Sequence, residues 1–286
     1  MTERLSIWLE LSDVDYCLHH VDVGPWSTRV LDTGGTKQPM VLMHGTGGHL
    51  EAYSRNIAHL AQDFRVIAFD SPGHGYSTHA TELLELDTYI DHLDGFLSTL
   101  DLRDVVLNGE SLGGWVAIKY TAKHPERIDK LILNTPGGTM ATPEVMERIR
   151  TLSQAAADDP NPQRIRERLE WLMADNTSVT EELVDVRRRI YSREGFSTSM
   201  TQILCLQDPD IRQRNLVTDD ELTSIDQPAL VIWTSDDPSG PAAAGMEMAE
   251  KLPNGQFVLV EGAGHWPQWE QPERFHEAIA GFIGSA

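Results

Sequence analysis

Cysteines and long apolar runs are scarce in this chain of 286 residues. The two cysteines, Cys17 and Cys205, lie too far apart for a disulfide framework or a metal-binding spacing, so two free thiols are expected. No apolar run reaches the roughly 18 residues that a membrane-spanning helix needs. Residues 1–10 lack the basic start, the continuous apolar stretch and the small-residue cleavage site of a secretory signal. We therefore expect a cytoplasmic protein.

Positive charge is scarce as well, because 23 Lys and Arg residues face 44 Asp and Glu residues, for a formal net charge of −21. Nucleic acids and anionic membranes are bound through basic surfaces, so neither is an expected partner. Repeats of solenoid length and low-complexity tracts are also absent. What remains is a globular chain whose expected partner is a small-molecule substrate. The sequence leaves the oligomeric state open, a homo-oligomer included.

Short apolar segments alternate with amphipathic ones along most of the chain. This pattern predicts the α/β class, with a mostly parallel eight-stranded sheet covered by helices on both faces. Residues 16–23 and 27–32 flank a Gly-Pro turn and are typical of an antiparallel hairpin at the sheet edge. The other strands are expected at 40–43, 64–69, 105–108, 131–133, 229–233 and 257–260. Helices are expected at 53–60, 86–100, 112–123 and 272–283.

Residues 138–226 break this alternation. They contain no convincing strand pattern, but helical periodicity occurs near residues 145–152, 165–172 and 183–191. We therefore predict a core domain of residues 1–137 and 227–286 and a helical subdomain of residues 138–226. An insert that follows the carboxyl end of a strand lies over the site in a sheet enzyme, so this subdomain is interpreted as a lid.

Residues 109–113 read Gly-Glu-Ser-Leu-Gly, between a predicted strand and a predicted helix. The G-x-S-x-G pattern places its serine on a sharp, strained turn whose neighbours must be small. Ser111 is therefore the candidate nucleophile. A glycine-rich turn with a passive serine is the alternative, which the flanking strand and helix disfavour. The arrangement resembles the α/β-hydrolase superfamily, and the resemblance extends from about Val30 to Ile283.

A base and an acid are expected later in the chain. His265 follows the last predicted strand, from which an imidazole can take the serine proton and later pass it on. Asp237 stands where the superfamily often has its acid, at the end of a G-x-x-D turn, although Thr234 replaces the glycine. Asp236 is the other candidate and would otherwise be a solvated turn residue. The order serine, acid, histidine is that of the superfamily.

Residues 44–48, His-Gly-Thr-Gly-Gly, resemble the H-G-x loop of the superfamily. The resemblance implies that the backbone N–H groups of Thr46 and Leu112 face the developing oxyanion, with Gly45 beside the substrate. A phosphate-binding loop is disfavoured, because no Lys-Ser/Thr pair follows. Asp70 and His74 belong to a tight Pro- and Gly-containing turn and are interpreted as structural.

Residues 264–270, Gly-His-Trp-Pro-Gln-Trp-Glu, resemble the segment around the histidine of meta-cleavage product hydrolases. Those enzymes hydrolyse a C–C bond of 2-hydroxy-6-oxo-hexa-2,4-dienoates in aromatic compound degradation. Trp266 carries this resemblance, although packing alone would explain it equally well. The resemblance implies a lid arginine for the substrate carboxylate; Arg187 aligns best and Arg188 next. A solvated helix face is the commoner role of an arginine in such a place.

Two departures weaken this assignment. The loop after His44-Gly45 is shorter than in those enzymes and lacks their asparagine. Glu110 replaces the asparagine that they tend to carry before the nucleophile, and an ionised Glu110 would repel a nearby carboxylate unless it is protonated or turned away. A carboxylesterase or lactonase with the same triad is therefore the second hypothesis, and a non-catalytic ligand-binding protein is the third. No metal or organic cofactor is implied, because side chains and backbone fill every role.

Overall fold

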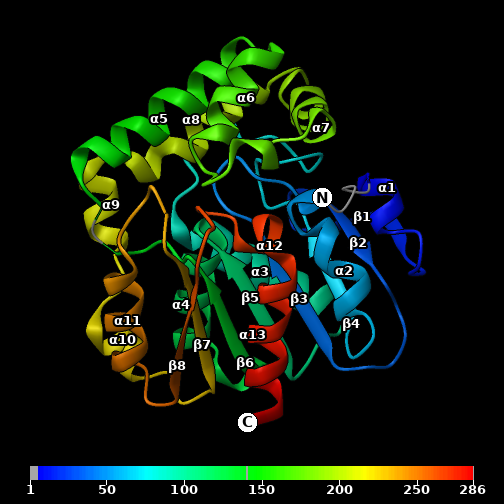
Figure 1. Ribbon diagram of the computed structural model, residues 1–286, viewed down its shortest axis with the longest axis vertical. Coiled ribbons are helices and arrows are strands. Elements are labelled where there is room, and N and C mark those ends of the chain that lie inside the picture. Colours follow the sequence, from blue (N-terminus) through cyan, green and yellow to red (C-terminus); the bar gives the residue numbers. More distant parts are fainter. Residues whose placement is uncertain (1–5, 140, 286) are drawn as a thin grey trace.

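The computed structural model describes residues 6–139 and 141–285, and an eight-stranded sheet forms its centre (Figure 1). The strand order is β1-β2-β4-β3-β5-β6-β7-β8. Strands β3 to β8 pair in parallel, whereas β1 and β2 form the predicted antiparallel hairpin at the edge. The strands are β1 (Cys17–Val23), β2 (Trp26–Asp32), β3 (Pro39–Met43), β4 (Arg65–Phe69), β5 (Val105–Glu110), β6 (Ile128–Asn134), β7 (Ala229–Thr234) and β8 (Gly255–Val260). The predicted fold class and strand positions are confirmed.

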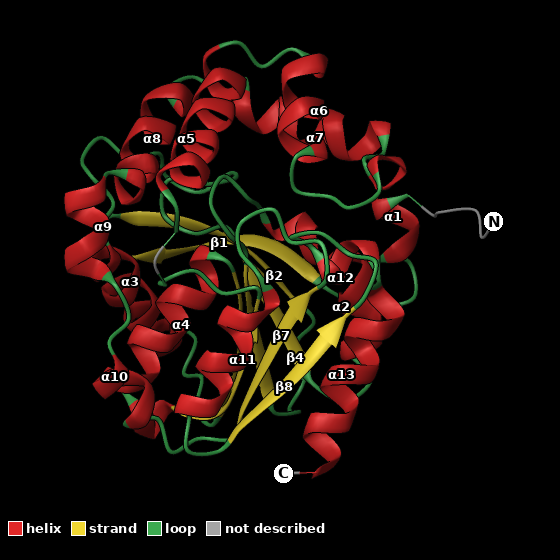
Figure 2. Ribbon diagram, turned by 60° about the vertical axis from the view of Figure 1, so that its left-hand side comes forward, coloured by secondary structure: helices red, strands yellow, loops and turns green. Residues whose placement is uncertain are grey.

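Helices cover both faces of this sheet (Figures 1 and 2). Outside the segment between β6 and β7 they are α1 (Ile7–Glu10), α2 (Ser54–Leu60), α3 (Leu86–Thr99), α4 (Leu112–Lys123), α11 (Ala242–Lys251), α12 (Pro267–Glu270) and α13 (Pro272–Ser285). In β3, Val41 and Met43 join the core under α3, α4 and α11, while Met40 and Leu42 join the core under α2 and α13. Both faces of the strand are therefore buried, which explains its unbroken apolar run.

The segment between β6 and β7 contains only helices and turns among its described residues. Its helices are α5 (Pro143–Asp158), α6 (Pro162–Glu170), α7 (Glu181–Tyr191), α8 (Phe196–Ile203), α9 (Pro209–Asn215) and α10 (Asp219–Thr223). Helices α5 to α8 lie beyond the carboxyl ends of the parallel strands (Figure 1). Their apolar side chains form a core of their own, which Trp266 and Trp269 of the main body join. The division of the chain into a core domain and a separate lid stays a prediction.

The turn after β4 has the contacts of a structural element. Asp70 is fully buried, accepts hydrogen bonds from the N–H groups of Leu50 and Tyr76 at 2.8 Å each, and pairs with Arg29 Nε at 2.8 Å. A Cβ on Gly75, whose φ is +54°, would lie 2.0 Å from the Asp70 carboxylate, so only glycine fits there. The turn thus ties β2 and the loop after β3 to β4.

Two further expectations concern the whole chain. Cys17 is exposed and Cys205 is buried, and both are free thiols as predicted. No helix in the described part of the chain is long and apolar enough to cross a membrane. Residues 1–5, half of the segment searched for a secretory signal, lie outside the described residues.

Candidate active site

Ser111 occupies the turn between β5 and α4 in a strained backbone conformation, with φ +52° and ψ −113°. Its neighbours leave no room for larger residues. A Cβ on Gly109 would lie 2.3 Å from the carbonyl oxygen of Gly113, and a Cβ on Gly113 would lie 2.4 Å from that of Met43. The two glycines of the motif are therefore required by close backbone packing, and a non-glycine residue held at positive φ indicates a functional constraint at Ser111.

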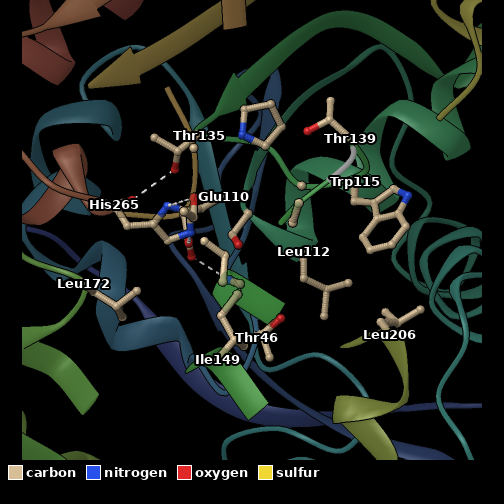
Figure 3. A pocket seen from close by; sticks show the side chains of 18 of the residues that line it. Thr46, Glu110, Leu112, Trp115, Thr135, Thr139, Ile149, Leu172, Leu206 and His265 are labelled. Atoms are coloured by element: carbon tan, nitrogen blue, oxygen red, sulfur yellow. Dashed lines mark hydrogen bonds and ion pairs between the residues drawn. The ribbon is translucent and has the colours of Figure 1, made fainter. Parts of the chain in front are cut away.

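One cavity brings most of the predicted residues together. Gly45, Thr46, Glu110, Ser111, Leu112, His265 and Trp266 all line it. Figure 3 shows the His265 ring and the Glu110 side chain close together on one side, with Trp115 and Leu206 on the other. Helices α5 and α6 contribute Ile149 and Arg168, so the segment between β6 and β7 forms part of the cavity wall.

Asp237, and not Asp236, is hydrogen-bonded to His265. The two carboxylate oxygens of Asp237 lie 2.9 and 3.0 Å from His265 Nδ1, and its side chain is fully buried. Ser239 Oγ donates a hydrogen bond of 2.7 Å to the same carboxylate. Asp236 is exposed, and its carboxylate accepts from the Ser235 hydroxyl. A carboxylate at Nδ1 orients the imidazole so that Nε2 is available for proton transfer.

His265 also has a second carboxylate neighbour. Its Nε2 lies 3.4 Å from Oε1 of Glu110, whose Oε2 accepts a 2.6 Å hydrogen bond from the Gly45 N–H. Burial disfavours the imidazolium, but Asp237 and then Glu110 outweigh that cost and raise the pKa of His265. Burial also raises the pKa of Glu110, against the opposing effects of His265, the Gly45 N–H and Arg187. The carboxyl that precedes Ser111 therefore faces the imidazole.

The two expected oxyanion donors lie at the same cavity. Leu112 is the first residue of α4, where backbone N–H groups have no partner within the helix. Among the described residues, the N–H groups of Thr46 and Leu112 have no backbone acceptor. The loop of Thr46 approaches β5 so closely that a Cβ on Gly45 would lie 2.7 Å from both Glu110 Oε1 and Ser111 Cβ. The assignment of these two N–H groups to an oxyanion hole stays a prediction.

The two candidate arginines point in different directions from α7. Arg187 is only 1% exposed, and its guanidinium lies over the rings of Trp266, at 5.1 Å, and Tyr191, at 5.9 Å. Its Nε and Nη2 have no hydrogen-bond partner among the described residues. Arg188, one position along the helix, is partly exposed and pairs with Asp185 at 3.4 Å. Adjacent helical positions face about 100° apart, so the two side chains have different surroundings. Neither arginine is among the described residues that line the cavity, and a contact of either with substrate stays a prediction.

Three residues of the site were missed by sequence reasoning. Ser239 hydrogen-bonds the Asp237 carboxylate, Thr135 Oγ1 donates to the His265 carbonyl at 3.0 Å, and Arg168 lines the cavity from α6. Thr135 has φ +41°, but no local pattern marks it. Arg168 is one of several arginines in a polar helix, and only its burial distinguishes it.

Comparisons with known proteins identify the family of this chain. A profile of the alpha/beta hydrolase fold family matches residues 38–272. The chain belongs to this family. A 2-hydroxy-6-oxononadienedioate/2-hydroxy-6-oxononatrienedioate hydrolase of Paraburkholderia phymatum is 34% identical over 268 residues, covering 88% of this chain and 89% of the relative. The protein is thus a hydrolase.

Two solved structures show the same fold. The meta-cleavage product hydrolase of Pseudomonas fluorescens matches with a TM-score of 0.81 at 24% identity, over 93% of this chain and 97% of the other. A thermophilic esterase of Thermogutta terrifontis matches with a TM-score of 0.77 at 25% identity, over 95% of this chain and 99% of the other. C–C bond hydrolases and esterases therefore share the architecture of this hydrolase, and the fold alone does not distinguish them.

Proposed function

We propose that this hydrolase cleaves the C–C bond of a 2-hydroxy-6-oxo-hexa-2,4-dienoate-type substrate, with Ser111, His265 and Asp237 as its triad. The observation that carries the proposal is Arg187, a buried guanidinium whose Nε and Nη2 have no partner among the described residues and which lies over the ring of Trp266, a residue of the cavity wall. A buried cation is costly unless an anion accompanies it. A substrate carboxylate fills that role, because a guanidinium binds carboxylates in a two-pronged geometry.

The proposed chemistry begins with ketonisation of the dienol, which creates an electron sink. His265 then takes a proton from Ser111, or from a water molecule, and the oxygen attacks the C6 ketone. The N–H groups of Thr46 and Leu112 hold the oxyanion. The C5–C6 bond breaks, its electron pair moves through the enone to the C2 oxygen, and His265 returns the proton. One water is consumed, and a hydroxydienoate and a carboxylic acid are released.

The substrate that we favour carries a second carboxylate. The relative of Paraburkholderia phymatum is named for a nonadienedioate, a substrate with a carboxylate at each end. We extend this substrate class to the present hydrolase, so the acid released would be a dicarboxylic acid such as succinate.

One observation favours a carboxylesterase or lactonase instead. Glu110 stands beside the nucleophile, and its charge would oppose a dienoate carboxylate in the same cavity. An ester substrate without a carboxylate avoids that repulsion. The same triad and the same two N–H groups would serve ester hydrolysis, without the ketonisation step.

Assays of the purified protein with dienoates and with nitrophenyl esters distinguish the two activities. C–C hydrolysis removes the absorbance of the coloured dienolate, and Ser111→Ala should lower that rate by about 10³-fold or more. Ser235→Ala is the control, because Ser235 is exposed, its hydroxyl bonds to Asp236 and to the Gly262 N–H, and it is not one of the residues that line the cavity. If nitrophenyl esters are hydrolysed while every dienoate tried is inert, the C–C proposal is wrong and the esterase replaces it.

A further inference from the structure

One buried arginine that lines the cavity has no role in the proposed chemistry. Arg168 of α6 is 3% exposed and lines the same cavity as Ser111 and His265. Its Nε donates a 2.8 Å hydrogen bond to Ser153 Oγ, and its guanidinium lies 5.3 Å from the Trp171 ring centroid. Its Nη1 has no hydrogen-bond partner among the described residues. A guanidinium so held has lost most of its water without gaining an anion.

The charge of Arg168 persists in this position. Burial lowers the pKa of Arg168 to about 10, which leaves the guanidinium protonated at neutral pH. No aspartate or glutamate forms an ion pair with it in the described part of the chain. An unpaired buried cation at a ligand cavity is expected where the ligand itself is the counter-ion.

Arg168 and Arg187 belong to different helices, α6 and α7. The guanidinium of Arg187 lies over the rings of Trp266 and Tyr191. Arg168 is hydrogen-bonded to α5 through Ser153, and its charge opposes the protonation of His265. The C6 ketone of the proposed substrate carries two chains, the dienoate chain and the acyl chain, which leave the carbon in different directions. If the dienoate chain extends towards Arg187, the acyl chain can extend towards α5 and α6.

The other arginine among the described residues that line the cavity has carbonyl partners. Arg212 donates to the carbonyl oxygens of Thr139 at 2.9 Å and Leu206 at 3.4 Å, and it lies over the Trp115 ring. Its charge therefore holds the segment that connects α8 to α10 against the core. Among the described residues, Arg168 hydrogen-bonds a neutral hydroxyl and leaves its terminal Nη1 without a partner, whereas the nitrogen of Arg212 that lacks a partner is Nε.

We propose that Arg168 binds the carboxylate on the acyl side of a dicarboxylic substrate and so sets the preference for that class. The proposal rests on the proposed function: Arg187 holds the dienoate carboxylate, Ser111 attacks C6, and Arg168 holds the far carboxylate of the acyl chain. Its Nη1 donates to that carboxylate, while the bond to Ser153 and the Trp171 ring hold the guanidinium in place. A neutral acyl chain leaves Arg168 unpaired.

The test compares two substrates that differ only in the terminal group. They are 2-hydroxy-6-oxonona-2,4-dienedioate and 2-hydroxy-6-oxonona-2,4-dienoate, in which a methyl group replaces the far carboxylate. Wild type should favour the dienedioate in kcat/KM. Arg168→Met should lower kcat/KM for the dienedioate by about 10- to 100-fold, as expected for a charged hydrogen bond, and change the dienoate value less than about threefold. Arg168→Lys should restore part of the preference.

Arg164→Met is the matched control, since Arg164 lies on the same helix, is largely exposed and pairs with Asp159. It should leave both values unchanged. Equal losses on both substrates in Arg168→Met would overturn the proposal and make Arg168 a structural residue. Equal kcat/KM values of wild type for the two substrates would overturn it as well.

A second substrate pair keeps this outcome separate from the C–C proposal. Nitrophenyl hydrogen succinate and nitrophenyl butyrate have the same acyl groups as the two dienoates. If wild type hydrolyses the esters but neither dienoate, the C–C proposal fails. The Arg168 proposal is then tested by the preference of wild type for the succinate ester over the butyrate ester in kcat/KM. Arg168→Met should diminish this preference. If Arg168→Met does not fold, Arg168→Lys should diminish it.

Discussion

Replacement of Glu110 by glutamine tests the electrostatics of the site most directly. Glu110 lies 3.4 Å from the nitrogen of His265 that has to accept a proton, and it contributes to the raised pKa of that imidazole. Glutamine keeps an oxygen for the Gly45 N–H but carries no charge. Without that charge the imidazolium loses a stabilising neighbour, so the pKa of His265 should fall.

The size of the effect follows from the distance. At 3.4 Å, an effective dielectric between about 20 and 80 makes the ion pair worth about 1 to 5 kcal/mol, or about 1 to 4 pH units in the titration of His265. Burial raises the pKa of Glu110 itself, which reduces its negative charge where His265 titrates. The lower end, about 1 pH unit, is therefore expected.

The assay is the pH profile of kcat/KM. A base must be neutral to act, so the rate rises with pH through the pKa of His265 in the free enzyme. Glu110→Gln should move this acid limb to lower pH. Glu270→Gln is the control, because Glu270 is also buried and accepts from backbone N–H groups but forms no ion pair with His265. An acid limb that stays at the wild-type pH in Glu110→Gln would refute the reasoning.

Three further outcomes are expected. Asp237→Asn should lower kcat by about 10⁴-fold, while Asp236→Asn should change it less than about threefold; equal losses would show that the wrong carboxylate was chosen. Arg187→Met should lower kcat/KM for dienoates by about 10- to 100-fold and spare nitrophenyl butyrate, with Arg188→Met as the unaffected control on the same helix. Gly75→Ala should reduce the free energy of unfolding by about 2 kcal/mol or more, measured by urea denaturation, because its Cβ would collide with a buried carboxylate; an unchanged midpoint would contradict the close contact.

Local pattern was sufficient for the sheet and for the turn that carries the candidate nucleophile. A strand buried on both faces is largely apolar, and β3 and the first five residues of β7 show this in the sequence. The glycines around Ser111 are required by contacts within one turn, so the motif carries its own geometry. Chain order then pointed to His265 and to a pair of neighbouring aspartates.

The choice within that pair needed the tertiary structure, because Asp236 and Asp237 differ only in which way one turn directs them. The same holds for Arg187 and Arg188, which adjacent positions on α7 send to the interior and to solvent. Arg168 looks like any surface arginine until α5 and Trp171 enclose it. Spacing along the chain determines which element a side chain belongs to, whereas the packing of one element on another decides what it faces and whether its charge finds a partner.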